Sequence, residues 1–308
     1  MKVLVTGGSG FLGSHVADAL SNAGHSVTIF DIRKSPYLSD NQKMVIGDLM
    51  NTTQVEEQLQ GIDVVYHLAG IADIDECKVR PVDTARINIL GTVQLLEACH
   101  KAAIKRFVFA SSAYVFSNAG SFYRSSKHAC ESFIEDYSEM YDLKYTCLRY
   151  GSLYGPRADE HNSIYNLISQ AVKEGKIIYH GTGEEQREFI HVQDAAQNSV
   201  KILEPEYENT YITLTGKEKM PYSDLLEMIK EMLDNRISIK IVPSTRKAHY
   251  KITPYNFNPK LGMKLVNNPH VDMGQGLLQC IAELFEKLHS EKSSDLGIFV
   301  NNHKNNGL

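Results

Sequence analysis

A glycine-rich loop directly after a short apolar run constrains the fold of this chain more than any other feature. Val3–Val5 leads into Thr6-Gly7-Gly8-Ser9-Gly10-Phe11-Leu12-Gly13, which contains the pattern G-x-x-G-x-x-G. Glycines at these spacings allow a sharp turn after a strand, bring backbone N–H groups against phosphate oxygens and pack the next helix on a sheet. An amphipathic stretch follows, and a second apolar run ends at Asp31. The context predicts a β-α-β unit that binds a dinucleotide pyrophosphate.

Asp31 lies 18 residues after Gly13. An acid at this distance accepts hydrogen bonds from the adenosine ribose and repels a 2′-phosphate, which favours NAD over NADP. Arg33 and Lys34 follow closely and could host a 2′-phosphate, so NADP is the alternative. A second interpretation of Asp31 is a local loop cap, but its spacing matches the ribose role.

Runs with strand character alternate with helical periodicity over the first half of the chain: Val3–Val5, Val27–Phe30, Met44–Ile46, Val64–Leu68, Phe107–Ala110 and Tyr145–Leu148. This alternation predicts an α/β fold with a Rossmann-type doubly wound parallel sheet, and residues 1–150 are expected to form an NAD-binding domain. The periodicity also predicts long helices over 82–100 and 123–141.

The pattern changes after this domain, where glycine-containing loops interrupt shorter helical stretches. Residues 151–288 are expected to form mainly a smaller C-terminal α/β lobe that binds substrate, with some segments returning to the Rossmann sheet. Two helices and two strands are predicted for this lobe, at 225–233, 276–288, 211–214 and 237–242. The polar tail, 289–308, has little to bury, so we expect mobility or a peripheral contact.

Composition excludes several classes of function. The 308 residues carry a net charge of −5, so no basic excess points to nucleic acid. Five cysteines without a C-x-x-C spacing indicate reduced thiols in a cytoplasmic protein rather than disulfides or a zinc site. No apolar run approaches the roughly 18 residues that span a bilayer, so no membrane segment is expected. The histidines show no metal-binding spacing, and we expect no metal.

Tyr123 and Lys127 stand four residues apart at the start of a predicted helix, so their side chains share one face. A lysine ammonium, together with the charge of bound NAD⁺, could move the pKa of a phenol from about 10 toward neutrality, as a general base requires. Tyr-x-x-x-Lys also occurs by chance on solvated helix faces. Ser111 and Ser112 favour catalysis, because they end a predicted strand at the sheet edge where ligands of this fold bind.

Further motifs follow in order over most of the chain: Gly47-Asp48-Leu49, His67-Leu68-Ala69-Gly70, Asn88-x-x-Gly91-Thr92, Ser111-Ser112-x-x-Val115, Leu148-Arg149-Tyr150, Tyr154-Gly155-Pro156-Arg157, and Gly181-x-Gly183 leading into Arg187-x-Phe189-Ile190-x-Val192-x-Asp194. With the glycine loop, Asp31 and the Tyr-Lys pair, they resemble the extended short-chain dehydrogenase/reductase family. The likeness is strongest to its NAD-dependent nucleotide-sugar epimerase/dehydratase branch.

The resemblance implies catalytic roles for three residues. Tyr123 would be the acid/base, Lys127 its partner and a ligand of the nicotinamide ribose, and Ser112 the hydroxyl bonded to the reacting sugar oxygen. In the family the active hydroxyl stands three residues before the valine of S-x-x-V, here Val115, which selects Ser112 over Ser111.

The binding residues that we predict complete the site. Besides Tyr123 and Lys127, the cofactor side comprises Gly7, Gly10, Phe11, Leu12, Gly13, Asp31, Arg33, Asp48, Leu49, Leu68, Ala69 and Tyr150. The substrate, a nucleotide-diphosphate sugar, would contact Ser112, Ser152 and Arg187. The guanidinium fork of Arg187 suits a pyrophosphate; its alternative role is a surface salt bridge with Glu184 or Glu185.

The residues after Ser112 bear on the reaction that the resemblance implies. Dehydratases of this branch carry Asp-Glu where this chain has Ala113 and Tyr114, and decarboxylases usually carry Glu at the second position. Epimerisation is therefore favoured, at C4 through a transient 4-keto intermediate, with Tyr123 taking and returning the hydroxyl proton. The alternatives are a nucleotide-sugar dehydrogenase or keto-reductase, a dehydratase, and a non-catalytic NAD-binding sensor or partner protein.

Three departures from the family concern the sugar side. Only residues 116–122 separate Val115 from Tyr123, where relatives have a longer segment that helps to roof the sugar. Ala72, followed by Asp73, replaces a lysine that glucose epimerases typically carry. Gly151-Ser152 replaces Phe-Asn. Family members commonly pair through the helices corresponding to 82–100 and 123–141, so the resemblance also implies a homodimer.

Overall fold

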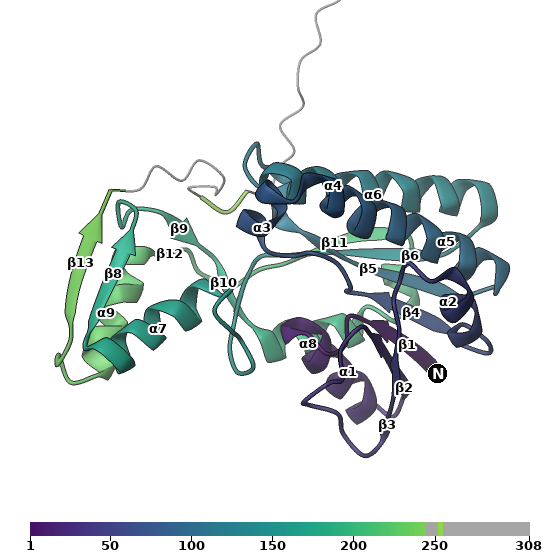
Figure 1. Ribbon diagram of the computed structural model, residues 1–308, viewed down its shortest axis with the longest axis horizontal. Helices are drawn as coiled ribbons and strands as arrows, with labels where there is room; N and C mark the ends of the chain where they lie inside the picture. Colours follow the sequence, from purple (N-terminus) through teal and green to yellow (C-terminus); the bar gives the residue numbers. More distant parts are fainter. Residues whose placement is uncertain (244–251, 255–308) are drawn as a thin grey trace, which may run out of the picture. The chain divides into compact units, whose positions relative to one another are not determined.

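A seven-stranded parallel sheet lies at the centre of the computed structural model (Figure 1), which describes residues 1–243 and 252–254. The strands follow in the order β11 (Thr210–Leu214), β6 (Tyr145–Tyr150), β5 (Arg106–Ser112), β4 (Val64–His67), β1 (Lys2–Thr6), β2 (Ser26–Asp31) and β3 (Gln42–Ile46). Each pair of neighbours is parallel. The doubly wound sheet is therefore confirmed, and all six predicted runs contribute a strand.

Side chains of the central strands alternate between two cores, one on each face of the sheet. Leu4 and Phe107 belong to one core, whereas Val3, Val5 and Val108 belong to the other. Successive residues of a strand point to opposite faces. Because both faces are buried, these strands appear in the sequence as continuous apolar runs.

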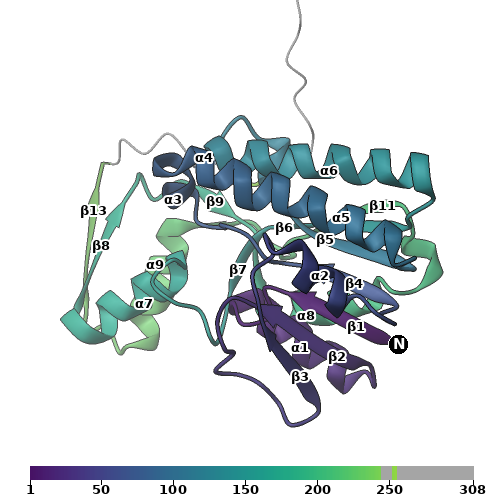
Figure 2. The ribbon, with the colours of Figure 1, turned by 45° about the vertical axis from the view of Figure 1, so that its right-hand side comes forward.

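Helices cover both faces of the sheet (Figures 1 and 2). On one face α1 (Phe11–Asn22) packs beside α8 (Val192–Lys201), and both contribute to the core around Val3. The other face is covered by α2 (Thr52–Gln58), α5 (Gly91–Lys101) and α6 (Ser121–Tyr141). The helix predicted over 123–141 is thus confirmed as α6.

The helix predicted over 82–100 is interrupted. It consists of α4 (Pro81–Thr84), a π-helical segment (Ala85–Leu90) and α5, and it follows the short helix α3 (Ile74–Val79). The Asn88 carbonyl in the π-helical segment accepts a hydrogen bond from Cys130 Sγ at 3.1 Å. A single π-helical turn inserts one residue into an otherwise α-helical segment, and so short an irregularity has no distinctive sequence pattern, which is why a uniform helix was predicted.

A smaller lobe is assembled from pairs of short strands. β7 (Ser152–Tyr154) is parallel to β10 (Phe189–His191), β8 (Lys176–His180) is parallel to β13 (Ser238–Val242), and β9 (Gln186–Arg187) is antiparallel to β12 (Met220–Pro221). With α7 (Ser163–Glu174) and α9 (Tyr222–Met232), these strands enclose a third core. Two single 3₁₀ turns occupy Ala113–Phe116 and Pro205–Tyr207.

Of the lobe predictions, the helix at 225–233 and the strand at 237–242 correspond to α9 and β13. The strand at 211–214 was placed in the wrong sheet by the sequence pattern. It is β11, paired with β6, and Ile212 and Leu214 join the core beneath α8. The helix at 276–288 and the tail at 289–308 lie outside the described residues. None of the described helices is both long and apolar enough to cross a membrane.

Candidate active site

The glycine loop between β1 and α1 is closed by contacts that admit no side chain at two of its three motif glycines. A Cβ at Gly7, where φ is +75°, would lie 2.5 Å from Ala69 N, and a Cβ at Gly13 would lie 2.1 Å from Gly7 O. A Cβ at Gly10 would only touch Gly7 O at 3.4 Å. Packing of the protein itself requires Gly7 and Gly13, whereas Gly10 has room. A bare backbone at Gly10 suits close approach of a phosphate, so the loop fits a dinucleotide.

Asp31 ends β2 beside this loop. Its carboxylate accepts hydrogen bonds from Ser9 N at 3.0 Å and from Arg33 N at 3.1 Å. Ser9 Oγ in turn donates to Arg33 O at 2.8 Å. The loop-cap interpretation of Asp31 therefore describes contacts that exist. These contacts also hold a negative charge at the edge of the loop, as exclusion of a 2′-phosphate requires.

The two serines at the end of β5 have different partners. Ser111 Oγ donates to Glu131 Oε1 at 2.6 Å, and Glu131 forms a bidentate pair with Arg149, at 2.9 and 2.8 Å. Ser112 Oγ instead accepts a hydrogen bond from Tyr114 N at 3.3 Å. Consecutive residues of a strand face opposite sides. Ser111 is engaged in a buried ionic cluster, which leaves Ser112 as the hydroxyl that can donate to a ligand.

This ionic cluster was not predicted from the sequence. Glu131 lies four residues after Lys127 and eight after Tyr123 on α6, a spacing that places all three on one helix face. Glu131 is 5% exposed. The signal available in the sequence was an acid that continues the four-residue spacing of Tyr123 and Lys127. Its partner Arg149 is also held between the rings of Phe116 and Tyr211, at 4.6 and 4.1 Å.

Lys127 is buried beneath Tyr123. Its side chain is 6% exposed, and its Nζ donates to the Ala110 carbonyl of β5 at 2.8 Å. The same Nζ lies 5.8 Å from the centre of the Tyr123 ring and 4.8 Å from that of Phe109. Burial lowers the pKa of the Lys127 ammonium. These contacts exclude the solvated-face interpretation of Lys127 and bring the predicted Tyr-Lys pair together.

His67, at the end of β4, links the glycine loop to the helices behind the site. Its Nδ1 lies 2.7 Å from Thr6 Oγ1, and its Nε2 lies 2.9 Å from Thr92 Oγ1. Thr92 Oγ1 donates to the Asn88 carbonyl at 2.5 Å, so it must accept from His67, and the ring proton resides on Nε2. Burial, assisted by the charge of Lys127, lowers the pKa of His67 to about 3. The imidazole is therefore neutral and structural.

Asn88 fixes the segment that follows β4. Its side-chain amide makes two hydrogen bonds to the backbone of Ile71: Oδ1 accepts from N at 2.8 Å, and Nδ2 donates to O at 2.9 Å. Nδ2 also lies 3.1 Å from Ser126 Oγ on α6, one residue before Lys127. A Cβ at Gly70 would meet Asn88 Oδ1 at 2.8 Å. Asn88 thus connects the loop after β4 to the helix that carries Tyr123.

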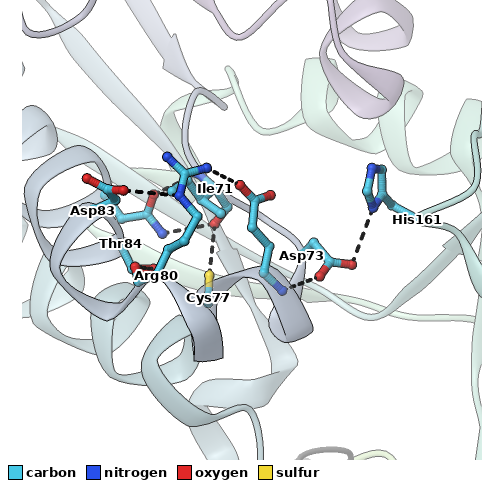
Figure 3. A network of polar contacts seen from close by, with 9 residues as sticks. Ile71, Asp73, Cys77, Arg80, Asp83, Thr84 and His161 are labelled. Atoms are coloured by element: carbon cyan, nitrogen blue, oxygen red, sulfur yellow. Dashed lines mark hydrogen bonds and ion pairs between the residues drawn. The ribbon is translucent and has the colours of Figure 1, made fainter.

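The acidic residues after Ile71 are engaged in local contacts (Figure 3). Asp73 Oδ1 caps α3 by accepting from Glu76 N at 2.6 Å, and its Oδ2 lies 3.6 Å from His161 Nδ1 on the segment before α7. Arg80 pairs with Asp83 at 3.0 Å and with Glu76 at 2.5 Å. The segment after Ala72 therefore carries several acidic side chains that are held in local contacts.

The remaining predicted residues are dispersed around this centre. Arg187, on β9, is 7% exposed, so it is a buried residue and not a surface one. Its Nη1 donates to Gln186 O at 2.9 Å, and its guanidinium lies 5.7 Å from the ring centre of Tyr222. Ser152 begins β7. Tyr150 is buried, and its hydroxyl lies 2.7 Å from Ser199 Oγ.

Other predicted cofactor contacts lie around the carboxyl ends of β1 to β4. Leu49 is buried in the core beneath α5, and Asp48 Oδ1 accepts from Met50 N at 2.9 Å. Phe11 and Leu12 begin α1. Leu68 N donates to Thr6 O at 3.0 Å, which brings the Leu68–Ala69 backbone against the glycine loop.

A cavity of about 420 Å³ lies elsewhere, in the smaller lobe between α7 and α9. Its walls are mostly apolar, and they include Tyr154, Phe189, Met220 and Leu225. Not one of the residues that we predicted for catalysis or binding lines it. The cavity and the predicted catalytic residues Ser112, Tyr123 and Lys127 therefore lie in different parts of the fold.

Comparisons with known proteins agree with this geometry. Residues 3–212 match the model of the NAD dependent epimerase/dehydratase family. The putative UDP-glucose 4-epimerase of Methanocaldococcus jannaschii is 29% identical over 302 residues, which cover 91% of this chain and 97% of that protein.

Two solved structures are similar over most of the chain. One is UDP-N-acetylglucosamine 4-epimerase from Methanobrevibacter ruminantium M1 in complex with UDP-N-acetylmuramic acid, with 30% identity, a TM-score of 0.77, and coverage of 83% of this chain and 89% of that one. The other is UDP-glucuronic acid 4-epimerase from Bacillus cereus with UDP-glucuronic acid and NAD, with 26% identity, a TM-score of 0.75, and coverage of 85% and 95%.

Proposed function

Since this chain belongs to the NAD dependent epimerase/dehydratase family, we propose that it is a nucleotide-sugar 4-epimerase. The relatives named above, whose names describe two 4-epimerases and one putative 4-epimerase, support this reaction. The observation that carries the proposal is the arrangement of three groups. A hydroxyl at Ser112, a phenol at Tyr123 and the buried ammonium of Lys127 converge where β5 meets α6, while Ala113 and Tyr114 supply no carboxyl group.

The residues at the carboxyl edge of the sheet would hold the cofactor. The backbone of the glycine loop would bind the pyrophosphate of NAD, and Asp31 the adenosine ribose. Lys127 would reach the nicotinamide ribose. Bound NAD⁺ supplies a hydride acceptor and, once reduced, a hydride donor.

The chain's own residues would handle the proton and the sugar. Ser112 Oγ accepts from Tyr114 N, and its own O–H would donate to the sugar oxygen. The cation of Lys127 favours the phenolate form of Tyr123, which removes the proton of the 4-hydroxyl as the carbon is oxidised. Tyr123 returns the proton when the carbon is reduced on the opposite face. Neither step requires a carboxyl group, which a dehydration does.

Incubation of the purified protein with UDP-, GDP-, CDP- and dTDP-sugars tests the proposal, with product stereochemistry followed by NMR and NADH by absorbance. We expect a C4 epimer without accumulation of NADH. Stoichiometric NADH with a keto-sugar would instead identify a dehydrogenase, and loss of water would identify a dehydratase. Tyr123→Phe is the control: NAD binding should persist while epimerisation disappears. Bound NAD with no turnover of any sugar would favour a sensor or partner protein.

We also propose a homodimer formed through α6. Phe122, Phe133 and Met140 lie on one face of this helix and are 47%, 40% and 73% exposed. Exposed apolar residues in a row mark an association surface. Light scattering should give twice the monomer mass, and Phe133→Glu with Met140→Glu should give the monomer, whereas Met232→Glu on α9 should not. A wild-type monomer would contradict the proposal.

A cytoplasmic location is the last part of the proposal. Cys77, Cys99, Cys130 and Cys147 are buried and unpaired, which suits a reducing compartment. Thiol labelling of the denatured protein, freshly isolated under conditions that trap free thiols, should modify all four. Protection of a pair of them would contradict this location.

A further inference from the structure

Tyr114 contacts both hydroxyl-bearing residues of the candidate site. Its backbone N donates to Ser112 Oγ at 3.3 Å. Its ring meets the ring of Tyr123 edge to face, with the centres 6.3 Å apart and the planes at 81°. Lys127 Nζ lies 5.8 Å from the centre of the same Tyr123 ring. The Tyr123 ring is therefore near both an aromatic ring and a buried cation.

The short connection that leads into α6 packs against the ring of Tyr114. Gly120 has a φ of +95°, and a Cβ there would lie 2.7 Å from Tyr114 Cδ1. The Tyr114 carbonyl accepts from Ser117 N at 2.9 Å, and Arg124 Nη1 donates to Ser117 O at 3.2 Å. The space beside Gly120 is occupied by Tyr114, so the short connection before α6 packs directly on the Tyr114 ring.

Phe116 stands two residues away on the same 3₁₀ turn and has a different neighbour. Its ring lies 4.6 Å from the guanidinium of Arg149, within the cluster that engages Ser111. The turn is thus anchored at one end by Phe116 on Arg149, and at the other by Tyr114 on Tyr123. Replacement of Phe116 should therefore weaken the attachment of the turn, whereas replacement of Tyr114 should remove the ring contact with the Tyr123 phenol.

We propose that Tyr114 is a positioning residue, whose ring holds the Tyr123 phenol close to Ser112 and Lys127. An edge-to-face pair restricts the orientation of both rings. A general base must lie within hydrogen-bond reach of its proton, so a loosely held phenol transfers protons less often. The inference rests on the proposed function for its kinetic consequence, but the placement of Tyr123 by Tyr114 does not depend on the substrate.

Three variants test this inference: Tyr114→Leu, Tyr114→Phe and Phe116→Leu. We expect Tyr114→Leu to lower kcat at least tenfold while KM and NAD affinity change less than about threefold. Tyr114→Phe, which keeps the ring, should have a kcat within about threefold of the wild-type value, and so should Phe116→Leu. Equal losses in Tyr114→Leu and Phe116→Leu would overturn the proposal, because the turn as a whole would then be responsible. Loss of kcat in Tyr114→Phe would overturn it too.

A second readout does not require turnover. Titration of Tyr123, followed by the tyrosinate ultraviolet band with the Tyr123→Phe protein subtracted, reports the surroundings of the phenol. In Tyr114→Leu the phenol should move away from Lys127 and titrate at higher pH, and in Phe116→Leu it should not move. If no sugar reacts but this shift appears, the function is wrong and the positioning role stands. An unchanged titration in Tyr114→Leu would overturn the positioning role.

Discussion

The cofactor side and the sugar side that we propose for this site are built from different parts of the chain. On the cofactor side, backbone approaches backbone: a Cβ at Gly13 would lie 2.1 Å from Gly7 O. On the sugar side, the shape comes from side chains on short turns, such as Tyr114 and Asp73. Steric exclusion leaves one residue type possible, whereas a side chain on a turn can be replaced by many others. The first side therefore specifies the family, and the second specifies what distinguishes this member.

The largest effect is expected at Gly13. Gly13→Ala should lower the free energy of unfolding by about 3 kcal/mol or more, because the helix must shift away from Gly7. Gly10→Ala should change it by less than about 0.5 kcal/mol, since a Cβ at Gly10 makes only ordinary contact. Chemical denaturation measures both. NAD affinity should nevertheless fall at least about tenfold in Gly10→Ala, because a methyl group would stand against the phosphate. Wild-type NAD affinity in Gly10→Ala would show that no phosphate approaches the backbone at Gly10.

Lys127 belongs to both sides, and its replacement should affect chemistry more than folding. Lys127→Met should lower kcat by about 10²- to 10⁴-fold, because the phenolate of Tyr123 loses its nearby cation. The pH at which kcat is half-maximal should rise accordingly. Lys101→Met, at an exposed ion pair on α5, is the matched control and should leave kcat unchanged. A Lys127→Met enzyme with the wild-type pH profile would show that the ammonium does not act on Tyr123.

His67, whose ring contacts Thr6 and Thr92 in the core behind the site, should make the stability of the fold depend on pH. The pKa of His67 is lowered to about 3 in the folded protein, so below pH 6.5 the unfolded chain binds a proton that the folded chain does not. The contribution of neutral His67 to the free energy of unfolding is fully present above pH 6.5 and falls by up to about 1.4 kcal/mol for each pH unit below it. Between pH 6.5 and 5, His67→Gln should lose about 2 kcal/mol less than the wild type in denaturation experiments. His128→Gln, an exposed change on α6, should keep the wild-type slope.

The smallest effect is expected at Asp31. Asp31→Asn should weaken NAD binding about tenfold and raise the relative affinity for NADP, because the carboxylate no longer opposes a 2′-phosphate. Ser9 N and Arg33 N donate to different oxygens of Asp31, and an amide keeps only one of these acceptors, so one bond should be lost and the free energy of unfolding should fall by about 1 kcal/mol. Calorimetric titration with both dinucleotides measures the ratio. An unchanged ratio would mean that Asp31 only caps the loop.

The contrast between the two sides also explains what could be predicted from the sequence. Buried parallel strands appear as apolar runs, and the glycine spacing is set by backbone clashes, so the sheet and its loop were both predictable. The π-helical segment between α4 and α5 was not, because one extra residue in a single turn has no distinctive sequence pattern. The cluster of Ser111, Glu131 and Arg149 joins residues from three elements. No spacing within a single element could identify that cluster as a whole.

Strand β11 carries a lesson about how such a protein can change. The chain leaves the central sheet after β6, builds β7 to β10, and returns through α8 to lay β11 along the edge of β6. A gene cut at residue 150 would encode a sheet whose last strand has an open edge, an aggregation hazard rather than a module. Recombination cannot exchange the smaller lobe as one cassette. New specificity is instead accessible through insertions and deletions in the connections, such as the segment before α6.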